Sequence, residues 1–140
     1  MFDKNLIDWT QVYIKNRDLI KKEIQEIKKI ENGFISLYTN HEIKYLIYPK
    51  LDVSVFEEIK EKINNDKIII KTTVICLNKK ENLKFIIENW VKFIIFKKLC
   101  LIFVNPKKNT KWLIIPYNHN KISEDIKPGL KTLFKNLEET

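Results

Sequence analysis

The stretch KIIIKTTVICLNKKENLKFIIENWVKFIIFKKLCLIFV, residues 67–104, decides the fold of this chain. It opens with a strand pattern, Lys67–Leu77, that is strongly β-branched at its centre. Residues 79–98 then have the clearest helical periodicity in the chain, and Leu99–Val104 is an apolar run without polar alternation. Such a run is typical of a strand that is covered on both faces. This strand–helix–strand unit predicts two parallel strands joined by a right-handed crossover.

A second crossover is predicted immediately before this unit. Phe34–Thr39 and Ile43–Tyr48 have the length and aromatic content of an antiparallel hairpin, with Asn40-His41-Glu42 as its turn. Ser54-Val55-Phe56-Glu57 matches a capping box and opens a helix that we expect to reach about Asn64. That helix connects the hairpin to the next strand, so three strands are expected to be parallel.

The two ends of the chain predict further helices and one more strand. Residues 3–31 place apolar side chains on one helical stripe that stops at Asn32-Gly33, and a break near Asn16–Asp18 stays open. Lys111–Tyr117 predicts a strand that follows a turn over residues 105–110. A final helix is expected from about Pro128, since proline is favoured at the first helical position.

The expected order of elements is α-β-β-α-β-α-β-β-α. We therefore predict an α/β fold, with α+β as the alternative. Residues 1–140 would form a single layered domain with one mixed five-stranded sheet and helices on both faces. A chain of 140 residues that is 44% hydrophobic and 31% charged suits a globular domain of this kind.

The composition also bounds location and chemistry. Cys76 and Cys100 fall inside predicted buried strands and lack a CxxC spacing, so we expect two reduced core cysteines. No apolar run is long enough for a membrane span and no leader pattern appears, so we expect a cytoplasmic protein that does not contact membranes. With two glycines in the whole chain, glycine-rich phosphate loops are excluded, and no cofactor is expected.

The positive charge is concentrated in one quarter of the chain. Residues 89–123 contain seven lysines and no Asp or Glu, whereas the other 105 residues hold 19 basic and 18 acidic residues. The chain has 25 lysines but one arginine, with 24 isoleucines and no alanine, a bias that AT-rich codons would produce. Such drift leaves open how much of the +8 is functional, but it does not explain the missing acids. The clustering predicts an anionic partner.

The topology suggests where that partner would bind. In sheets with parallel crossovers, ligands usually lie at the carboxyl ends of the parallel strands. Two of those strands are followed by asparagine, and lysines gather at the same edge. Each asparagine has a structural alternative, as a helix cap or as the start of a turn. The predicted nucleic-acid-binding residues are Asn78, Asn105, Lys79, Lys80, Lys107, Lys108, Lys111 and Trp112, with Tyr117 as a second ring for stacking.

The opposite edge of the predicted sheet holds the two histidines. His41 lies in the first hairpin turn and His119 follows the last strand, so the two turns would be neighbours if the strand order allows it. Together with Glu42 they are weak candidates for a metal or acid–base site. Exposed turn residues are the simpler interpretation.

The same topology places the residues that a Mg²⁺-dependent nuclease would need. Such a site needs an Asp, followed on the next strand by an acid two residues before a lysine, to hold Mg²⁺. Asp52 could supply the first ligand, but Ile69-Ile70-Lys71 has isoleucine where the acid is needed. Asp66 lies at the wrong end of that strand, so the metal site is incomplete.

The sequence therefore favours a non-enzymatic domain that binds nucleic acid or another polyanion through the lysines at the carboxyl edge. The first alternative is a protein–protein interaction subunit or a homodimer, because the helix over residues 85–96 is more apolar than one buried face requires. The second alternative is a nuclease-like or metal-dependent enzyme with an incomplete site.

Overall fold

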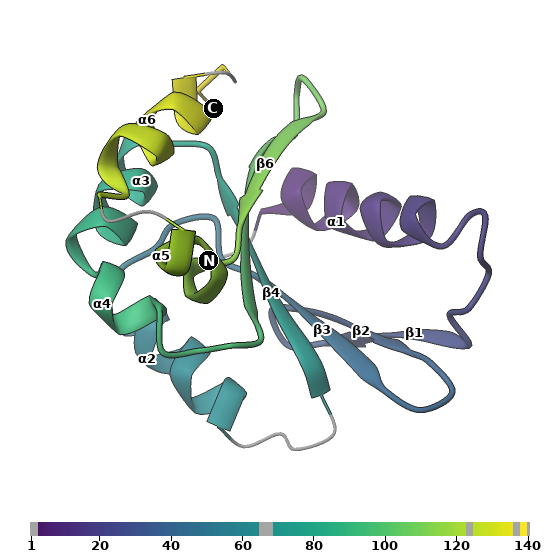
Figure 1. Cartoon of the computed structure of the whole chain (residues 1–140). Helices are drawn as coiled ribbons and strands as arrows, with labels where there is room; N and C mark the ends of the chain where they lie inside the picture. The colour runs from purple at the N-terminus through teal and green to yellow at the C-terminus, as the bar shows by residue number, and fades with distance from the viewer. Residues whose placement is uncertain (1–2, 65–68, 123–124, 136–137, 140) are drawn as a thin grey trace.

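The computed structural model describes residues 3–64, 69–122, 125–135 and 138–139. These residues form a mixed α/β fold around one six-stranded sheet with the strand order β1-β2-β3-β4-β5-β6 (Figure 1). The α/β class is as predicted, but the sheet has one strand more than the five expected. The strands are β1 Glu26–Ile30, β2 Gly33–Leu37, β3 Glu42–Ile47, β4 Ile69–Leu77, β5 Leu99–Asn105 and β6 Thr110–Ile114.

The directions of the strands confirm both predicted crossovers. β1, β2 and β3 form an antiparallel meander, β3, β4 and β5 are parallel, and β6 returns antiparallel to β5. One helix connects β3 to β4, and two short helices connect β4 to β5. The helices are α1 Lys4–Arg17, α2 Val53–Asn64, α3 Lys80–Glu88, α4 Trp90–Phe93, α5 Pro116–Ile122 and α6 Lys127–Lys135.

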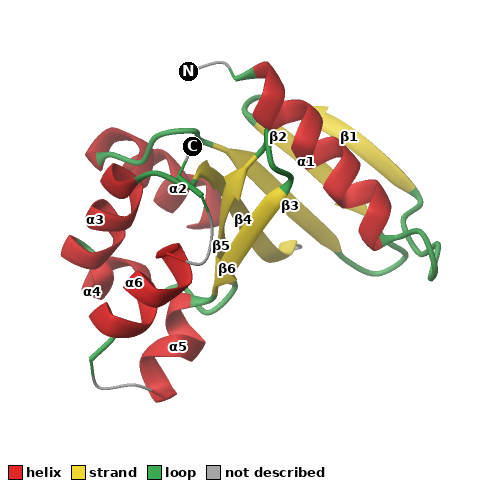
Figure 2. Ribbon diagram, turned by 90° about the horizontal axis from the view of Figure 1, so that it is seen from above, coloured by secondary structure: helices red, strands yellow, loops and turns green. Residues whose placement is uncertain are grey.

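The helices cover both faces of the sheet unequally. α1 lies alone on one face, and the other five helices lie on the opposite face (Figure 1, Figure 2). α1 presents Leu6, Thr10 and Ile14, spaced by four residues, to a cluster that includes Tyr45 and Ile102. The larger cluster on the other face combines residues of the sheet with α2, α3, α4 and α6. β5, which both clusters cover, is buried at every residue, as its apolar run predicted.

The predicted helix over residues 3–31 is wrong beyond Arg17. After α1, the carboxylate of Asp18 accepts hydrogen bonds from the amides of Glu23 and Ile24 at 2.7 and 3.1 Å, which holds a turn. β1 then pairs with β2 through the two-residue turn Glu31-Asn32. Asn32 adopts φ 61°, a left-handed conformation that asparagine tolerates, so Asn32-Gly33 closes a hairpin and does not end a helix.

Three other predicted boundaries need correction. The helix expected over residues 79–98 is divided into α3 and α4 at Asn89, whose side-chain amide donates to the carbonyl of Phe85 at 2.8 Å. The cap of α2 is Asp52, which accepts from the amide of Val55, and not the expected Ser54. The residues after β6 form α5 from Pro116 onward, where a strand followed by a loop was predicted. The observed order is therefore α-β-β-β-α-β-α-α-β-β-α-α.

Most of the apolar side chains of residues 85–96 pack against the core of the molecule. Phe93 is fully buried and meets the rings of Phe56 and Phe85 edge-on at 5.0 and 6.1 Å between centroids. The exposed apolar side chains of this segment are Val91 and Ile95. The main observation behind a protein partner or a homodimer is therefore reduced to two exposed side chains, one on α4 and one in the turn after it.

Candidate functional site

The structure brings together three of the predicted site residues at the carboxyl edge of the parallel strands. The indole Nε1 of Trp112 donates to Oδ1 of Asn78 at 2.8 Å. The side-chain amides of Asn78 and Asn105 both donate to the carbonyl oxygen of Glu138, at 3.1 and 3.2 Å. Trp112 is buried and its ring stacks on Phe103 with 4.1 Å between centroids, so it offers little free surface to a base.

Two of the predicted lysines also meet the C-terminal residues. The backbone amide of Lys80 donates to Oε2 of Glu139 at 3.0 Å. Nζ of Lys108 lies 3.8 Å from Oε2 of Glu138, and both side chains are well exposed. An exposed pair of this kind contributes about 0–1 kcal/mol. The edge that was expected to bind an external anion is therefore occupied by acidic residues of the same chain.

Of the other predicted lysines, Lys107 and Lys111 lie beside α1, whereas Lys79 stays at the carboxyl edge between Asn78 and Lys80. Side chains alternate along a strand, so Lys111 and its neighbour Trp112 point to opposite faces of β6. Lys111 consequently lies on the α1 side, with Nζ 5.6 Å from the centroid of the Tyr13 ring. Lys107 lines a hollow beside Trp9, and Lys79 is an exposed residue before α3. Tyr117, the second predicted stacking ring, has Nζ of Lys121 4.2 Å from its centroid.

A second basic and aromatic site lies between α1 and the hairpin formed by β5 and β6. It consists of two adjoining hollows of about 330 and 430 Å³, which we call the α1–hairpin groove. Trp9, Val12 and Asn109 belong to both hollows. The first is also lined by Tyr13, Asn16, Arg17 and Lys111, and the second by Asn5, Asp8, Pro106 and Lys107.

A hydrogen bond between residues 100 positions apart in the sequence joins the two sides of the groove. Trp9 and Tyr13, one helical turn apart on α1, stack with 5.0 Å between centroids and 11° between planes. The indole of Trp9 donates to Oδ1 of Asn109 at 2.8 Å, which ties α1 to the tip of the hairpin. Asn109 adopts φ 52°, a left-handed conformation at the end of the hairpin loop. The aromatic pair therefore has a fixed position relative to β6.

Two cations lie beside the Tyr13 ring of the aromatic pair. Arg17, the single arginine of the chain, places Cζ 5.7 Å from the centroid of Tyr13, at nearly the same distance as Nζ of Lys111. Burial raises the pKa of the Tyr13 hydroxyl, and the neighbouring guanidinium opposes that shift. A cation within about 6 Å of an aromatic centroid is attracted to the ring face. Arg17 and Lys111 are both exposed, so each can also meet a solvent-side anion.

The stability of the fold above pH 10 depends on Tyr45, which is buried beneath α1. Burial raises the pKa of Tyr45 to about 12, and Arg17 opposes the shift. An acid whose pKa is higher in the folded state than in the unfolded state stabilises the fold fully below pH 10, and this contribution is lost as the pH rises further. We expect the free energy of unfolding to fall by on the order of 2 kcal/mol between pH 10 and 12.

Urea denaturation at several pH values measures this loss, and Tyr45→Phe should show a smaller one. The loss should not vanish, because burial and Glu58 also raise the pKa of Tyr48. An equal fall in the wild type and in Tyr45→Phe would contradict the assignment.

The two histidines do not form a common site. His41 stacks on Tyr38 with 4.4 Å between centroids, whereas His119 lies edge-on to Trp90 at 6.0 Å. His41 precedes β3 and His119 lies in α5 after β6, and β4 and β5 separate these two strands by about 14 Å. Within residues 3–64, 69–122, 125–135 and 138–139, no group of three or more His, Cys, Asp and Glu is arranged to hold a metal ion.

The residues considered for a nuclease are also apart. Asp52 follows the carboxyl end of β3 and caps α2. Lys71 pairs with Ile43 at the amino end of β3, so the two side chains belong to opposite edges of the sheet. Asp66 lies outside the residues that the structure describes.

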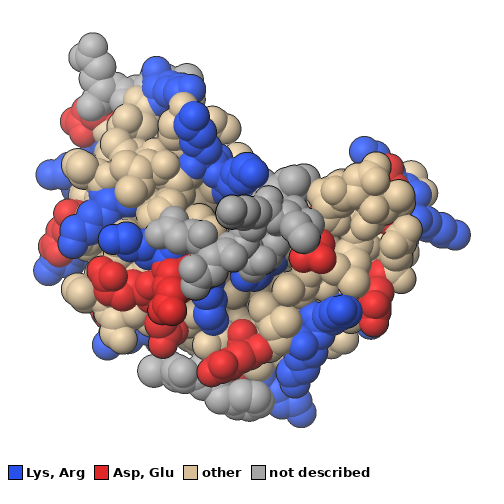
Figure 3. All heavy atoms as spheres, turned by 90° about the horizontal axis from the view of Figure 1, so that it is seen from below, with Lys and Arg blue, Asp and Glu red and all other residues tan. Residues whose placement is uncertain are grey.

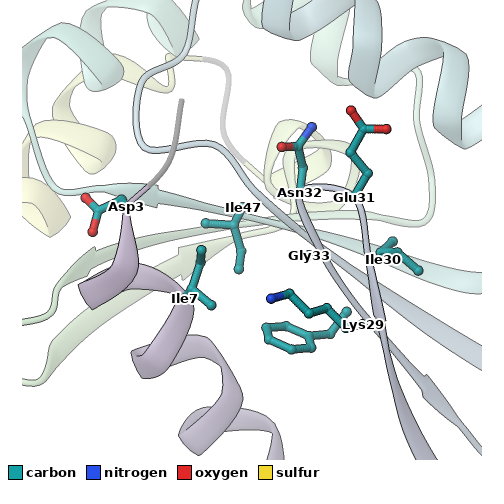
Figure 4. Close-up of a pocket in the computed structure, with 9 residues that line it drawn as sticks. Asp3, Ile7, Lys29, Ile30, Glu31, Asn32, Gly33 and Ile47 are labelled. Atoms are coloured by element: carbon teal, nitrogen blue, oxygen red, sulfur yellow. The ribbon is translucent and has the colours of Figure 1, made fainter.

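A further hollow of about 410 Å³ lies between the start of α1 and the turn from β1 to β2. Glu31 and Asn32 point away from Ile7 and Ile47, and among the labelled polar side chains Lys29 extends toward them (Figure 4). The carboxylate of Asp3 accepts from the amide of Leu6 and so acts as the helix cap. These polar groups do not converge on one point, so the hollow is a weaker candidate than the groove.

The total charge does not by itself mark a binding face. Figure 3 shows Lys and Arg side chains next to Asp and Glu side chains across the lower face of the molecule. The net charge of +8 is therefore not displayed on this face as one continuous basic surface. Cations at defined distances from aromatic rings are better evidence of a site than the total charge is.

Comparison with protein-family models, with curated proteins and with solved structures gives no match for this chain. Among the helices of the described residues, none has both the length and the apolar character that crossing a bilayer requires. The candidate site is therefore argued from its own geometry.

Proposed function

We propose that this chain binds single-stranded nucleic acid through the α1–hairpin groove, without catalysing a reaction. The observation that carries the proposal is the stacked pair of Trp9 and Tyr13, with the cations of Arg17 and Lys111 beside the Tyr13 ring. Proteins that bind single strands combine cations along the backbone path with aromatic rings on which bases stack. The groove offers both within two adjoining hollows.

The chemistry of the groove favours a single strand over a duplex. Trp9 is half-buried, so part of its ring is free for a base, and a base can stack on it only when it is not paired inside a helix. Arg17, Lys107 and Lys111 supply three cations against the single carboxylate of Asp8. Lysines and one arginine spread along a groove provide affinity for phosphates and little sequence discrimination.

The proposed binding surface lies on the α1 side of β6, whereas the sequence predicted one at the carboxyl edge of the parallel strands. Lys107 and Lys111 are common to both, and Asn78, Asn105 and Trp112 no longer contribute directly. This change follows from the contacts of Glu138 and Glu139, which cover the carboxyl edge.

Removal of the two cations beside Tyr13 tests the proposal. We expect Arg17→Gln/Lys111→Gln to bind a labelled oligothymidylate at least tenfold more weakly than the wild type in fluorescence anisotropy. The slope of log affinity against log salt should become shallower by about 1.4, since each lost phosphate contact on a single strand removes about 0.7.

Lys60→Gln/Lys131→Gln is the matched control, because it removes two exposed cations from α2 and α6 on the other face of the sheet. The control should retain most of the affinity of the wild type. Equal losses in the two double variants would show that only the total charge matters, and the proposal would then fail.

A further inference from the structure

The C-terminal residues Glu138 and Glu139, which we call the acidic tail, occupy a built site at the carboxyl edge. Asn78 and Asn105 are 0% and 4% exposed, and both of their side-chain amides donate to the one carbonyl oxygen of Glu138. The indole of Trp112 donates to Oδ1 of Asn78 and so fixes the orientation of that side-chain amide. If the tail left, both buried amides would need another acceptor, because unpaired buried donors are strongly disfavoured.

The same site also binds the carboxylates of the tail. Oε2 of Glu139 accepts from the amide of Lys80, at the first residue of the nine-residue helix α3. A helix N-terminus favours an anion, through its free amides and its dipole. Nζ of Lys108 lies 3.8 Å from Oε2 of Glu138 on the other side. The site therefore contacts a main-chain carbonyl and two consecutive carboxylates, groups that an acidic peptide presents.

The residues that bind the tail differ from the tail itself in burial. Asn78, Asn105 and Trp112 are buried among the strand ends, whereas both tail residues are exposed. The side chains of Lys108 and Glu138 are 60% and 70% exposed, so salt screens their attraction. The tail is attached through α6, which packs beside α3 (Figure 1). Since the tail residues are exposed and two of the four contacts are also exposed, the tail can be exchanged for another segment without rebuilding the receptor.

We propose that the carboxyl edge is a receptor for an acidic peptide with two consecutive carboxylate side chains, and that the tail occupies it as an autoinhibitory ligand. A partner that carries such a segment binds by displacing the tail. The receptor is distinct from the α1–hairpin groove and uses none of the residues that line it, so either proposal can fail alone.

Binding of the tail sequence in trans tests this receptor. The probe is a fluorescein-labelled peptide with the sequence of residues 134–140, FKNLEET. Glu138→Lys/Glu139→Lys, made in the 140-residue chain, replaces the tail carboxylates with cations, which the ammonium group of Lys108 and the helix N-terminus at Lys80 disfavour. We expect this variant to bind the peptide at least tenfold more tightly than the wild type, in which the tail competes. A peptide with the sequence FKNLKKT should bind to neither chain.

Three comparisons make the test decisive. Glu23→Lys/Glu26→Lys changes the same charge at the β1 edge and should bind the peptide like the wild type. In amide spectra, the resonance of Lys80 should move in the tail variant while the signals of β5 stay, which shows that the fold is kept. The milder Glu138→Gln/Glu139→Gln should give an intermediate affinity, and it replaces the lysine variant if that chain unfolds.

Equal peptide affinity in the wild type and in the tail variants, or binding by neither, would overturn the proposal and leave the tail as a permanent anchor of α6. Tripolyphosphate that displaces the labelled peptide as well as unlabelled FKNLEET does would also overturn it, because the site would then recognise charge alone.

Discussion

Replacement of Gly33 by alanine should destabilise the fold far more than the same replacement of Gly129, the other glycine of the chain. A Cβ atom at this position would lie 1.8 Å from the carbonyl oxygen of Tyr45 and 2.9 Å from its carbonyl carbon. Both atoms belong to the backbone of β3, where Gly33 pairs with Leu46. The clash can be relieved only by moving β2 away from β3, which breaks their ladder.

We expect Gly33→Ala to lose about 4 kcal/mol or more of the 5–15 kcal/mol that is typical for a domain. Urea denaturation followed by circular dichroism measures the change. Gly129→Ala is the matched control, because its Cβ would lie 3.7 Å from Nε2 of His119, an ordinary contact. In the helix α6, alanine should be neutral or stabilising by about 0.5 kcal/mol. A Gly33→Ala chain as stable as Gly129→Ala would show that β2 and β3 are not packed this closely.

Replacement of Asn82 by alanine is the second large effect that we expect. Asn82 is 1% exposed and its side chain makes three hydrogen bonds that join the ends of β3 and β4. Its Oδ1 accepts from the amide of Leu51 at 2.8 Å, and its Nδ2 donates to the carbonyls of Pro49 and Leu77 at 2.9 and 2.8 Å. The two carbonyls keep another donor each, but the buried amide of Leu51 would lose its partner.

An unpaired buried amide costs about 1–3 kcal/mol, and each lost hydrogen bond adds about 0.5–1.5 kcal/mol. We therefore expect Asn82→Ala to lower the free energy of unfolding by about 3 kcal/mol. Asn89→Ala, which removes one half-buried bond to Phe85, should cost at most about 1 kcal/mol in the same urea experiment. Similar losses for the two variants would contradict the role given to Asn82.

The part of the fold that the sequence predicts well is its buried centre. The parallel strands β3, β4 and β5 have apolar patterns that only a covered sheet can satisfy, and both crossovers followed from them. β1 was missed because Ile20, Ile24 and Ile27 continue the helical spacing of α1. Ile20 is 93% exposed, so that spacing was coincidental. What overrides it is the pairing of β1 with β2, a contact between strands that helical periodicity does not report.

The candidate site was only half predictable. Asn78, Asn105 and the lysines were placed at the carboxyl edge by chain direction alone, but their partner Glu138 is 60 residues from Asn78 in the sequence. The groove has a signal that was overlooked: Trp9, Tyr13 and Arg17 recur at intervals of four and so share one stripe of α1. Trp9 and Tyr13 were placed on the apolar stripe of the predicted helix, because spacing does not distinguish a buried stripe from one at the margin of a sheet.

The most direct test of the proposed function is to locate bound oligothymidylate on the protein by ¹H–¹⁵N correlation spectra. The indole Nε1–H of Trp9, which donates to Asn109, is a single assignable reporter inside the groove. We predict that this signal and the amides of Tyr13, Arg17 and Lys111 shift together and saturate at one affinity, while the indole of Trp112 stays unchanged. Unmoved groove signals, with shifts at Lys80 and Lys108 instead, would contradict the account.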